Sequence, residues 1–312
     1  VDTTAHTLSL HDALPISRKL SDLCRLLPDQ AEIHFYIDGV DLKIESGSGK
    51  YNLTTLPSED FPVFESEDTL SEISISPLNL KTLISTTSFA MGSDSWRSYL
   101  SGLNLIIDDN TITAVATDQS RLAVANSSLN TAVSENISGI VPKKSINEIG
   151  KLVSEASENI IIKLGTSSIS VNAGGTNFVS KLIEGKFPDH EQVIPFGESS
   201  SLKIDRKEFS DSLSRVSVLS GGDHKGVRFL TEKNIINISA NNPEKEHGEE
   251  SLSCKYDGEN IDIAFNVNYF QEILNSLNSQ EIEINFFGSE RSCLITEPNN
   301  ESLKYVVMPL LV

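Results

Sequence analysis

The chain has 312 residues, of which 25 are basic and 44 acidic, so it carries a formal net charge of −19. This length is too great for one ordinary domain and fits two or three domains, each able to bury its own core. No apolar run approaches the roughly 18 residues that a bilayer-spanning helix needs, so we expect no membrane span. Cys24, Cys254 and Cys293 are odd in number and widely spaced, which favours a reducing cytoplasm over a disulfide framework. The negative charge argues against a nucleic-acid partner unless the positive charges are gathered in one place.

The first residues differ in pattern from the rest of the chain. Residues 1–16 (VDTTAHTLSLHDALPI) show no sustained period of 2 or 3.6, whereas every segment from Ser17 onward is periodic. We therefore interpret residues 1–16 as a non-native leader and leave them out of the fold. A secretory signal is not expected, because the stretch lacks a basic start and a long apolar centre.

The chain repeats itself about every 125 residues. An apolar residue followed by proline ends an alternating strand at Phe61-Pro62, Phe187-Pro188 and Met308-Pro309. A second mark has the same spacing, since Gly102 and Gly226 each open a strand–turn–strand segment. Agreement between two independent marks predicts three repeated units. We place them in a partial first domain at 17–69, a second domain at 70–198 and a third domain at 199–312.

Each repeat has the same predicted order of elements, in which a strand is followed by a short amphipathic helix and then by several strands. Helical spacing of apolar residues predicts helices at 17–27, 77–88, 143–154, 206–219 and 267–277. Alternating or β-branched segments predict strands at TITAVAT, NIIIKLG, SISVNAG, NIINISAN and EIEINFFG. The fold class is α+β with mostly antiparallel sheet. The second and third repeats carry two helices each and the first only one, so we expect the first repeat to be about half length.

The positive charge is concentrated on the predicted helices. These spans contain ten basic and five acidic residues, although the whole chain is strongly acidic. Arg18 and Arg25, Lys144 and Lys151, and Lys207 and Arg215 are spaced so that each pair shares one helix face. Helices of this kind side by side would give a basic lane that exchanges counterions with a phosphate backbone without reading sequence. An ordinary solvated helix face explains the same charges.

Eight segments follow one another along the chain and carry a resemblance: TLPSEDFP, RSYLSGLNL, AVATDQSRLAV, SKLIEGKFPDH, KGVRF, ISANNPEKEHGEE, IAFNVNYFQEILNSL and YVVMPLLV. Together they resemble the DNA polymerase III beta subunit family, the bacterial sliding clamps. The resemblance implies three clamp domains with antiparallel sheets outside and two short helices inside, the first domain being about half present. It also implies a non-enzymatic processivity factor, two copies of which form a ring around double-stranded DNA. Binding to DNA is expected to be independent of the DNA sequence. The expected partners are the DNA polymerase III alpha subunit, the clamp loader and other clamp-motif proteins; no cofactor, metal or membrane is expected.

The resemblance also implies a partner-peptide pocket between the second and third domains. Its expected residues are Leu100, Thr117, Arg121, Leu122, Pro188, Val193, Asn266, Tyr269, Ser292, Val306, Met308, Pro309 and Leu310. The sequence departs from the family pattern at Gln119-Ser120, where Gly-His is frequent, at His224 and at Leu311. These departures bear on peptide affinity and partner choice. Without the resemblance, Met308-Pro309 reads as the end of a core strand.

The resemblance implies two further surfaces. The residues expected to face DNA are Arg25, Lys81, Arg97, Tyr99, Lys143, Lys144, Lys151, Lys207 and Arg215. Trp96 either stacks on a base or fills a gap. Ring closure is expected to join Tyr51 and Leu53 on an edge strand to Val218 and Leu219 of a second copy. Lys50 and the acidic run at 244–250 would add a weak opposite-charge fringe.

Other functions find less support in the residues. The segment Gly47–Lys50 (GSGK) lacks the upstream glycine and the following hydroxyl residue of a phosphate-binding loop, so we interpret it as a turn between strands. The six histidines form no pair at metal-ligand spacing, and no acidic pair indicates acid–base catalysis. The alternatives are a fragment that keeps only the peptide pocket and closes no ring, and a β-rich extracellular repeat protein.

Overall fold

The computed structural model describes residues 14–56, 69–93, 95–129, 133, 136–221 and 225–310. These residues fall into two compact units, Val1–Glu65 and Ser66–Val312. The Phe61-Pro62 mark and the departures at His224 and Leu311 lie outside the described residues.

The first unit combines one helix with a three-stranded antiparallel sheet. Helix α1 (Leu14–Leu26) begins within the stretch interpreted as a leader, and the rest of that stretch lies outside the described residues. The sheet contains β1 (His34–Asp38), β2 (Asp41–Ser46) and β3 (Gly49–Thr54) in that order. Gly47 takes a φ of +57° in the turn between β2 and β3, a conformation that glycine adopts without a Cβ clash. The GSGK segment is therefore a hairpin turn, as its sequence predicted.

The second unit is built around a nine-stranded antiparallel sheet. Its strand order is β16-β12-β18-β19-β20-β7-β6-β5-β8, and two four-stranded sheets, β11-β10-β9-β4 and β15-β14-β13-β17, complete the unit. The strands of the first half are β4 (Thr69–Ile75), β5 (Gly102–Asp108), β6 (Thr111–Thr117), β7 (Arg121–Ser128), β8 (Ile137–Pro142), β9 (Ile160–Gly165), β10 (Ser168–Ala173) and β11 (Thr176–Lys181). Those of the second half are β12 (Ser200–Asp205), β13 (Gly226–Glu232), β14 (Ile235–Asn241), β15 (His247–Ser253), β16 (Lys255–Tyr256), β17 (Asp262–Asn266), β18 (Glu281–Phe286), β19 (Cys293–Glu297) and β20 (Asn300–Val307).

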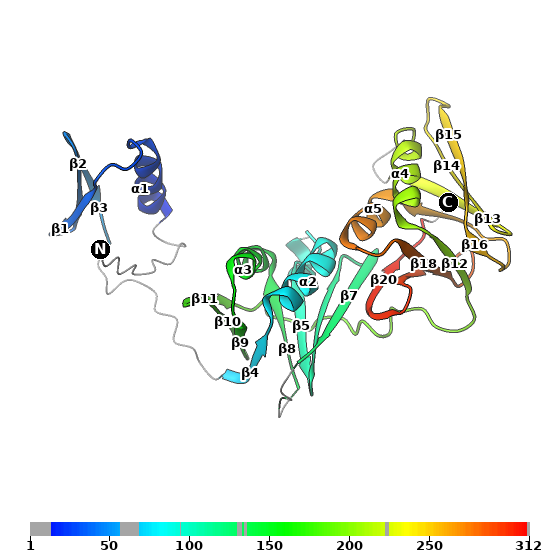
Figure 1. The fold of residues 1–312 in the computed structure, drawn as a ribbon, viewed down its shortest axis with the longest axis horizontal. Helices are drawn as coiled ribbons and strands as arrows, with labels where there is room; N and C mark the ends of the chain where they lie inside the picture. Colours follow the sequence, from blue (N-terminus) through cyan, green and yellow to red (C-terminus); the bar gives the residue numbers. More distant parts are fainter. Residues whose placement is uncertain are drawn as a thin grey trace. The chain divides into compact units, whose positions relative to one another are not determined.

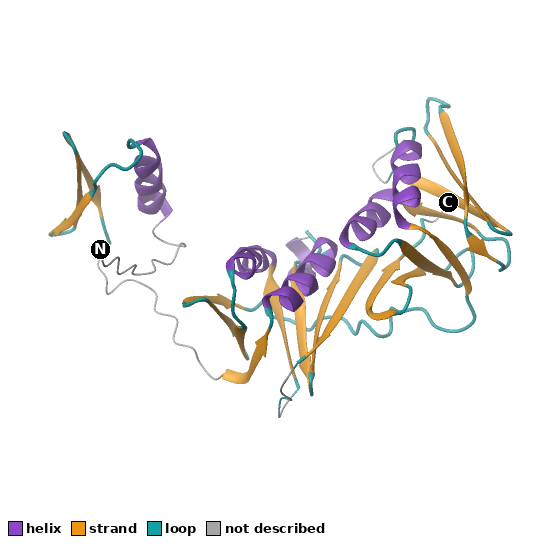
Figure 2. Ribbon diagram, in the orientation of Figure 1, coloured by secondary structure: helices purple, strands orange, loops and turns teal. Residues whose placement is uncertain are grey.

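Four α-helices of this unit occupy the positions expected from the repeats. They are α2 (Pro77–Thr87), α3 (Lys143–Glu155), α4 (Arg206–Ser217) and α5 (Val267–Ser276). Short 3-10 turns η2 (Ser88–Ala90) and η3 (Ser95–Leu100) follow α2. Helix α2 contacts both α3 and α5, and α5 contacts α4, so the four helices adjoin one another on one side of the sheets (Figures 1 and 2).

Local signals in the sequence explain where these helices begin. The side chain of Ser76 accepts a hydrogen bond from the amide of Asn79, and Pro77 occupies the first turn, where its missing N–H costs nothing. The Asp205 carboxylate caps α4 in the same way by accepting from the amide of Glu208. Each helix then turns an apolar stripe towards its sheet; on α4 this stripe includes Phe209, which is fully buried.

The two repeats of this unit share one continuous hydrogen-bonded sheet. Strand β20 of the C-terminal repeat pairs with β7 of the preceding repeat, from Leu303 opposite Ala125 to Val307 opposite Arg121. Both repeats contribute to the same large buried core. The predicted second and third domains therefore fold as one compact unit, and each has the two helices that the repeat pattern predicted. No helix among the described residues is long and apolar enough to cross a membrane.

Candidate functional site

A second buried apolar cluster lies apart from the main core, where β20 meets β7. It contains Leu100, Leu122 and Val306, which are 3%, 1% and 1% exposed. Leu122 and Val306 are direct cross-strand partners, and Phe187 packs into the same cluster. The structure thus brings three predicted pocket residues together and places Pro188 next to a fourth member of the cluster. Because these side chains are buried, they lie beneath the surface of the predicted pocket rather than on it.

The chain continues from β20 as an anchored segment along the cluster. The amide of Met308 donates to the carbonyl of Ser120 at 2.9 Å, and the amide of Leu310 donates to the carbonyl of Ala264 at 2.8 Å. These two bonds fix the segment to the end of β7 and to β17. The Met308 side chain is nevertheless 45% exposed. An exposed, flexible thioether held on a rigid backbone provides an adaptable apolar contact for a ligand.

Arg121 does not offer its charge to this site. It is 8% exposed; its Nε donates to Asp118 at 2.9 Å, and one terminal nitrogen donates to the carbonyl of Phe89 at 2.8 Å. The other terminal nitrogen forms an ion pair with Glu272 of α5, and the guanidinium lies 4.6 Å from the ring centroid of Tyr269. Arg121 therefore joins the two repeats, and its place in the peptide pocket stays a prediction.

Thr117 and Asn266 also make internal hydrogen bonds. The Thr117 hydroxyl donates to the carbonyl of Arg121 at 2.6 Å, which closes the turn between β6 and β7. Asn266 caps α5 by accepting from the amide of Asn268 at 3.0 Å. Pro188 and Val193 are exposed, whereas Tyr269, Ser292, Pro309 and Leu310 are half-buried. The fully exposed members of the predicted pocket are thus Pro188, Val193 and Met308.

Two partners of Arg121 were not predicted from the sequence, and only one of them has a local sequence signal. Asp118 sits three residues before Arg121, and its carboxylate accepts from two following amides, a local turn pattern that the letters TDQSR contain. Glu272 lies 151 residues away from Arg121 in sequence. No local signal could have paired it with Arg121.

The predicted DNA-facing cations fall into two groups. Lys81, Lys143 and Lys144 are exposed, and none has an ion-pair partner within the part of the chain that the structure describes. In contrast, Lys151 pairs with Glu148 at 2.8 Å, Lys207 with Asp211 at 2.9 Å, and Arg215 with both carboxylate oxygens of Glu250 at 2.6 Å. The second group is already neutralised locally.

Two of these ion pairs lower the pKa of the carboxyl group that takes part in them. A hydrogen bond from Lys207 lowers the pKa of Asp211, and a hydrogen bond from Arg215 lowers the pKa of Glu250. Glu250 belonged to the acidic fringe expected at the ring interface. Its charge is balanced within the chain, which weakens that fringe further.

The remaining predicted DNA contacts lie on α1 and η3. Arg25 on α1 and Arg97 on η3 are exposed, while Tyr99 is half-buried. Trp96 is 92% exposed, so the interpretation of its ring as a filler of a core gap is wrong. Stacking of the Trp96 ring on a base stays a prediction.

The predicted pairing residues lie on sheet edges or next to them. Strand β3, with Tyr51 and Leu53, is an edge of the first sheet, and Tyr51 is 37% exposed. Val218 caps α4 at its C-terminus and is 78% exposed. Leu219 is half-buried and packs near Gly248 of β15, which is an edge strand of its own sheet. Both surfaces therefore present unpaired backbone beside apolar side chains.

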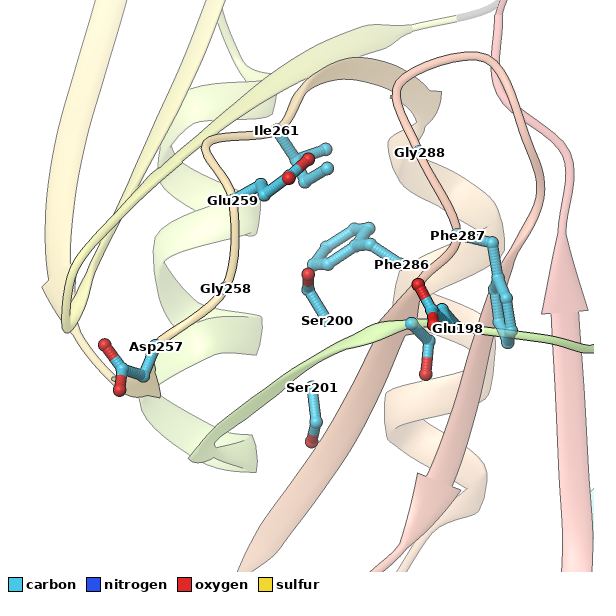
Figure 3. Close-up of a pocket in the computed structure, with 11 residues that line it drawn as sticks. Glu198, Ser200, Ser201, Asp257, Gly258, Glu259, Ile261, Phe286, Phe287 and Gly288 are labelled. Atoms are coloured by element: carbon cyan, nitrogen blue, oxygen red, sulfur yellow. The ribbon is translucent and has the colours of Figure 1, made fainter.

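Two cavities of about 740 Å³ each were not expected from the sequence. One is lined by residues from 198–201, 257–261 and 286–288, among them the acidic residues Glu198, Asp257 and Glu259 as well as Phe286 (Figure 3). The other lies beside Phe187 and Pro188. Neither coincides with the predicted pocket, although the second shares Pro188 with it.

The described residues contain no group of three or more histidine, cysteine or acidic side chains able to hold a metal ion. The described cysteines are free thiols, and burial raises the pKa of Cys254 to about 11 and that of Cys293 further. A raised pKa leaves little thiolate at neutral pH, so neither group suits nucleophilic chemistry.

Comparison with known proteins decides the family. Models of the DNA polymerase III beta subunit match nearly the whole chain: the N-terminal domain over residues 13–65, the central domain over 74–189 and the C-terminal domain over 191–311. The chain belongs to the DNA polymerase III beta subunit family. The resemblance read from the sequence is thereby confirmed, as is the prediction of three repeated clamp domains.

Relatives and solved structures agree with this assignment. The beta sliding clamp of Pseudomonas aeruginosa is 35% identical over 294 residues, covering 94% of this chain and 80% of the relative, and that of Escherichia coli K12 is 32% identical over the same shares. A crystal structure of the DNA polymerase III subunit beta from Pseudomonas aeruginosa superposes with a TM-score of 0.91 at 35% identity, covering 95% of this chain and 82% of that one. A Caulobacter crescentus beta sliding clamp, solved with PEG bound to a putative beta-motif tethering region, gives 0.89 at 31% identity over 95% and 81%.

Family membership also settles the broader expectations. The beta clamp is a non-catalytic processivity factor of DNA replication, so the prediction that the chain is not an enzyme is confirmed. The alternative of a β-rich extracellular repeat protein is wrong. The family models begin at residue 13 and divide the chain at 189–191, whereas the sequence predicted a leader up to 16 and a division at 198–199.

Proposed function

We propose that the chain is a DNA sliding clamp that encircles duplex DNA and tethers the replicative polymerase through a short peptide. The observation that carries the proposal is the exposed Met308 on its anchored segment, set beside the buried cluster of Leu100, Leu122 and Val306. A ring around DNA cannot leave sideways, so weak contacts permit sliding while the tethered enzyme stays at a high effective concentration. The partners are double-stranded DNA, the DNA polymerase III alpha subunit, the clamp loader and other clamp-motif proteins, and the setting is the cytoplasm.

The peptide pocket is supported by its chemistry. A rigid apolar floor with a few exposed apolar groups suits a peptide that inserts one or two large apolar side chains. Clamps of Pseudomonas aeruginosa and Bartonella birtlesii have been solved bound to griselimycin. We infer that this chain also binds ligands. Since Arg121 is saturated by internal partners, apolar contact supplies most of the affinity.

The inner surface is supported by Lys81, Lys143 and Lys144 on the adjoining helices α2 and α3. Exposed cations of this kind position a protein on phosphates without reading bases. Ring closure is supported by the edge strands β3 and β15, with Tyr51 and Leu53 of one copy meeting Val218 and Leu219 of the next.

Fluorescence polarisation with a labelled peptide carrying a polymerase-type clamp-binding motif tests the proposal. We expect saturable binding that weakens about tenfold in Met308→Ala, which corresponds to about 1.4 kcal/mol of lost apolar contact. Leu78→Ala on α2 is the matched control, because Leu78 is a 72% exposed apolar side chain outside the predicted pocket. No binding by the folded chain, or equal loss in both variants, would count against the pocket.

A further inference from the structure

The cavity beside Phe187 and Pro188 has a mixed lining. Strand β5 contributes Asn104 and Ile106, strand β8 contributes Ile140, and the segment 182–191 closes the other side. Its volume of about 740 Å³ lies within the range of sites that hold a small ligand or a few peptide residues. The walls near the sheet combine apolar Ile106 and Ile140 with polar Asn104, Ser138 and Thr166, and the rim is charged.

Asn104 is the unusual member of this lining. It is 5% exposed, yet its cross-strand neighbours Val115 and Ile140 are both buried apolar residues. Its side-chain amide has no hydrogen-bond partner among the residues that the structure describes. Thr117, a buried polar residue of the neighbouring strand β6, is satisfied by the carbonyl of Arg121. Buried amides are normally paired, so Asn104 presents a free donor and acceptor to the cavity.

The cavity adjoins the predicted peptide pocket and shares residues with it. Ile140 and Phe187 line the cavity and also belong to the buried cluster that contains Leu122 and Val306. Pro188 belongs to the predicted pocket and lines the cavity as well. Because Pro188 and Asn104 line the same cavity, a peptide segment that passes Pro188 enters the space that Asn104 faces.

The charges at the rim restrict the occupant. Glu184, Asp189 and Glu191 outnumber Lys186 in the lining, which disfavours an acidic segment. A peptide unit can accept one hydrogen bond from the Asn104 amide and donate another to it. The apolar surfaces of Ile106 and Phe187 suit an adjacent aliphatic side chain.

We propose that this cavity is an accessory subsite that binds a neutral, aliphatic peptide segment flanking the clamp-binding motif of a partner, with Asn104 bonding to its main-chain amide. This inference rests on the proposed function, because the flanking segment is delivered by the motif. It assigns a specificity-determining role to Asn104, which the resemblance to the family did not include in the pocket.

Three labelled peptides test the subsite by fluorescence polarisation. One carries the core motif alone, and the others add the neutral extension Ala-Leu-Ala at the amino or the carboxyl end, with capped termini. We expect one extended peptide to bind the wild-type chain at least fivefold more tightly than the core peptide. In Asn104→Leu, which keeps the size but removes the amide, this gain should disappear. Asn172→Leu is the matched control, since Asn172 is an exposed strand asparagine outside the cavity.

The core peptide separates the two proposals. If it does not bind the wild-type chain, the proposed function fails. If it binds but neither extension improves affinity, the subsite is overturned while the proposed function stands. A gain that persists in Asn104→Leu would also overturn the assignment of Asn104. A gain lost in Asn104→Leu and kept in Asn172→Leu would establish it, and unchanged core binding by Asn104→Leu would show that the variant is folded.

Discussion

The guanidinium of Arg121 on β7 lies over the ring of Tyr269 on α5, 4.6 Å from its centroid. The same guanidinium forms ion pairs with Asp118 and Glu272, so one side chain connects two repeats that are already joined by β20 and β7. Because Arg121 is only 8% exposed, these partners rather than water stabilise the charge of its guanidinium. Arg121 therefore stabilises the junction between the two repeats, beside which we propose the peptide pocket.

Replacing Arg121 should destabilise the chain substantially. In Arg121→Met the charges of Asp118 and Glu272 lose their partner, and we expect a cost of about 2–3 kcal/mol, below the full value for a buried pair because Glu272 remains partly solvated. Arg228→Met is the control: Arg228 makes a similar two-point pair with Asp262, but on the surface, where such pairs contribute about 0–1 kcal/mol. Urea unfolding measures both variants. Equal losses would contradict a joint at Arg121.

Gln119→Gly should stabilise the chain. Gln119 has a φ of +82°, in the left-handed region that favours glycine, and it stands where the sequence departs from the family pattern. We expect a gain of about 0.5–1 kcal/mol, since relief of backbone strain outweighs the added freedom of the unfolded chain. Gln280→Gly, at a residue outside the positive-φ set, should instead lose about the same amount. Thermal unfolding of the two variants gives the sign directly.

The positions of the helices and strands could be predicted from the sequence, whereas the contacts between side chains could not. Helix α3 was predicted at 143–154 and runs from Lys143 to Glu155, because its apolar spacing and Pro142 are local signals. The strand TITAVAT matches β6 for the same reason. The saturation of Arg121 and the free amide of Asn104 both depend on residues distant in sequence. Such partners follow from the tertiary fold, which no local pattern encodes.

His190 should make the stability depend on pH. Burial lowers its pKa from the ordinary 6.5, outweighing the opposing carboxylates of Glu191 and Asp189, and Lys304 lowers it further. Below pH 6.5 His190 binds a proton in the unfolded chain but stays neutral in the folded chain. The contribution of His190 to the free energy of unfolding is therefore complete above pH 6.5 and is lost as the pH falls through the lowered pKa of the folded state. His190→Gln should lose less stability than wild type between pH 7.5 and 5.5. A midpoint for His190 at or above 6.5 in an NMR titration would contradict this prediction.

The pairing of two copies should be weak and should depend on Val218. Its side chain is 78% exposed and adjoins Leu219, and the expected acidic fringe is partly neutralised because Glu250 is bound to Arg215. We therefore expect sedimentation velocity to show a monomer–dimer equilibrium that shifts with protein concentration. Val218→Lys should remain monomeric over the same range, whereas Leu230→Lys, at an exposed apolar position of β13, should behave as wild type. Dimerisation of Val218→Lys at wild-type strength would rule out this surface.

Cations that lack internal partners should dominate the salt dependence of DNA binding. Lys144 is exposed and has no ion pair within the described residues, whereas Lys207 is held by Asp211 at 2.9 Å. Each phosphate contact contributes about 0.9 to the slope of log affinity against log salt for duplex DNA, so Lys144→Ala should lower that slope by about 0.9. The double variant Lys207→Ala, Asp211→Ala keeps the net charge of the chain. Because the removed ion pair does not displace counterions from the DNA, the slope of log affinity against log salt should change little. Fluorescence polarisation with a short blunt duplex between 50 and 200 mM NaCl separates the two cases. If the double variant lowered the slope as much as Lys144→Ala, Lys207 would have to leave Asp211 for a phosphate when DNA is bound, and the division of the cations into free and paired groups would not hold in the complex.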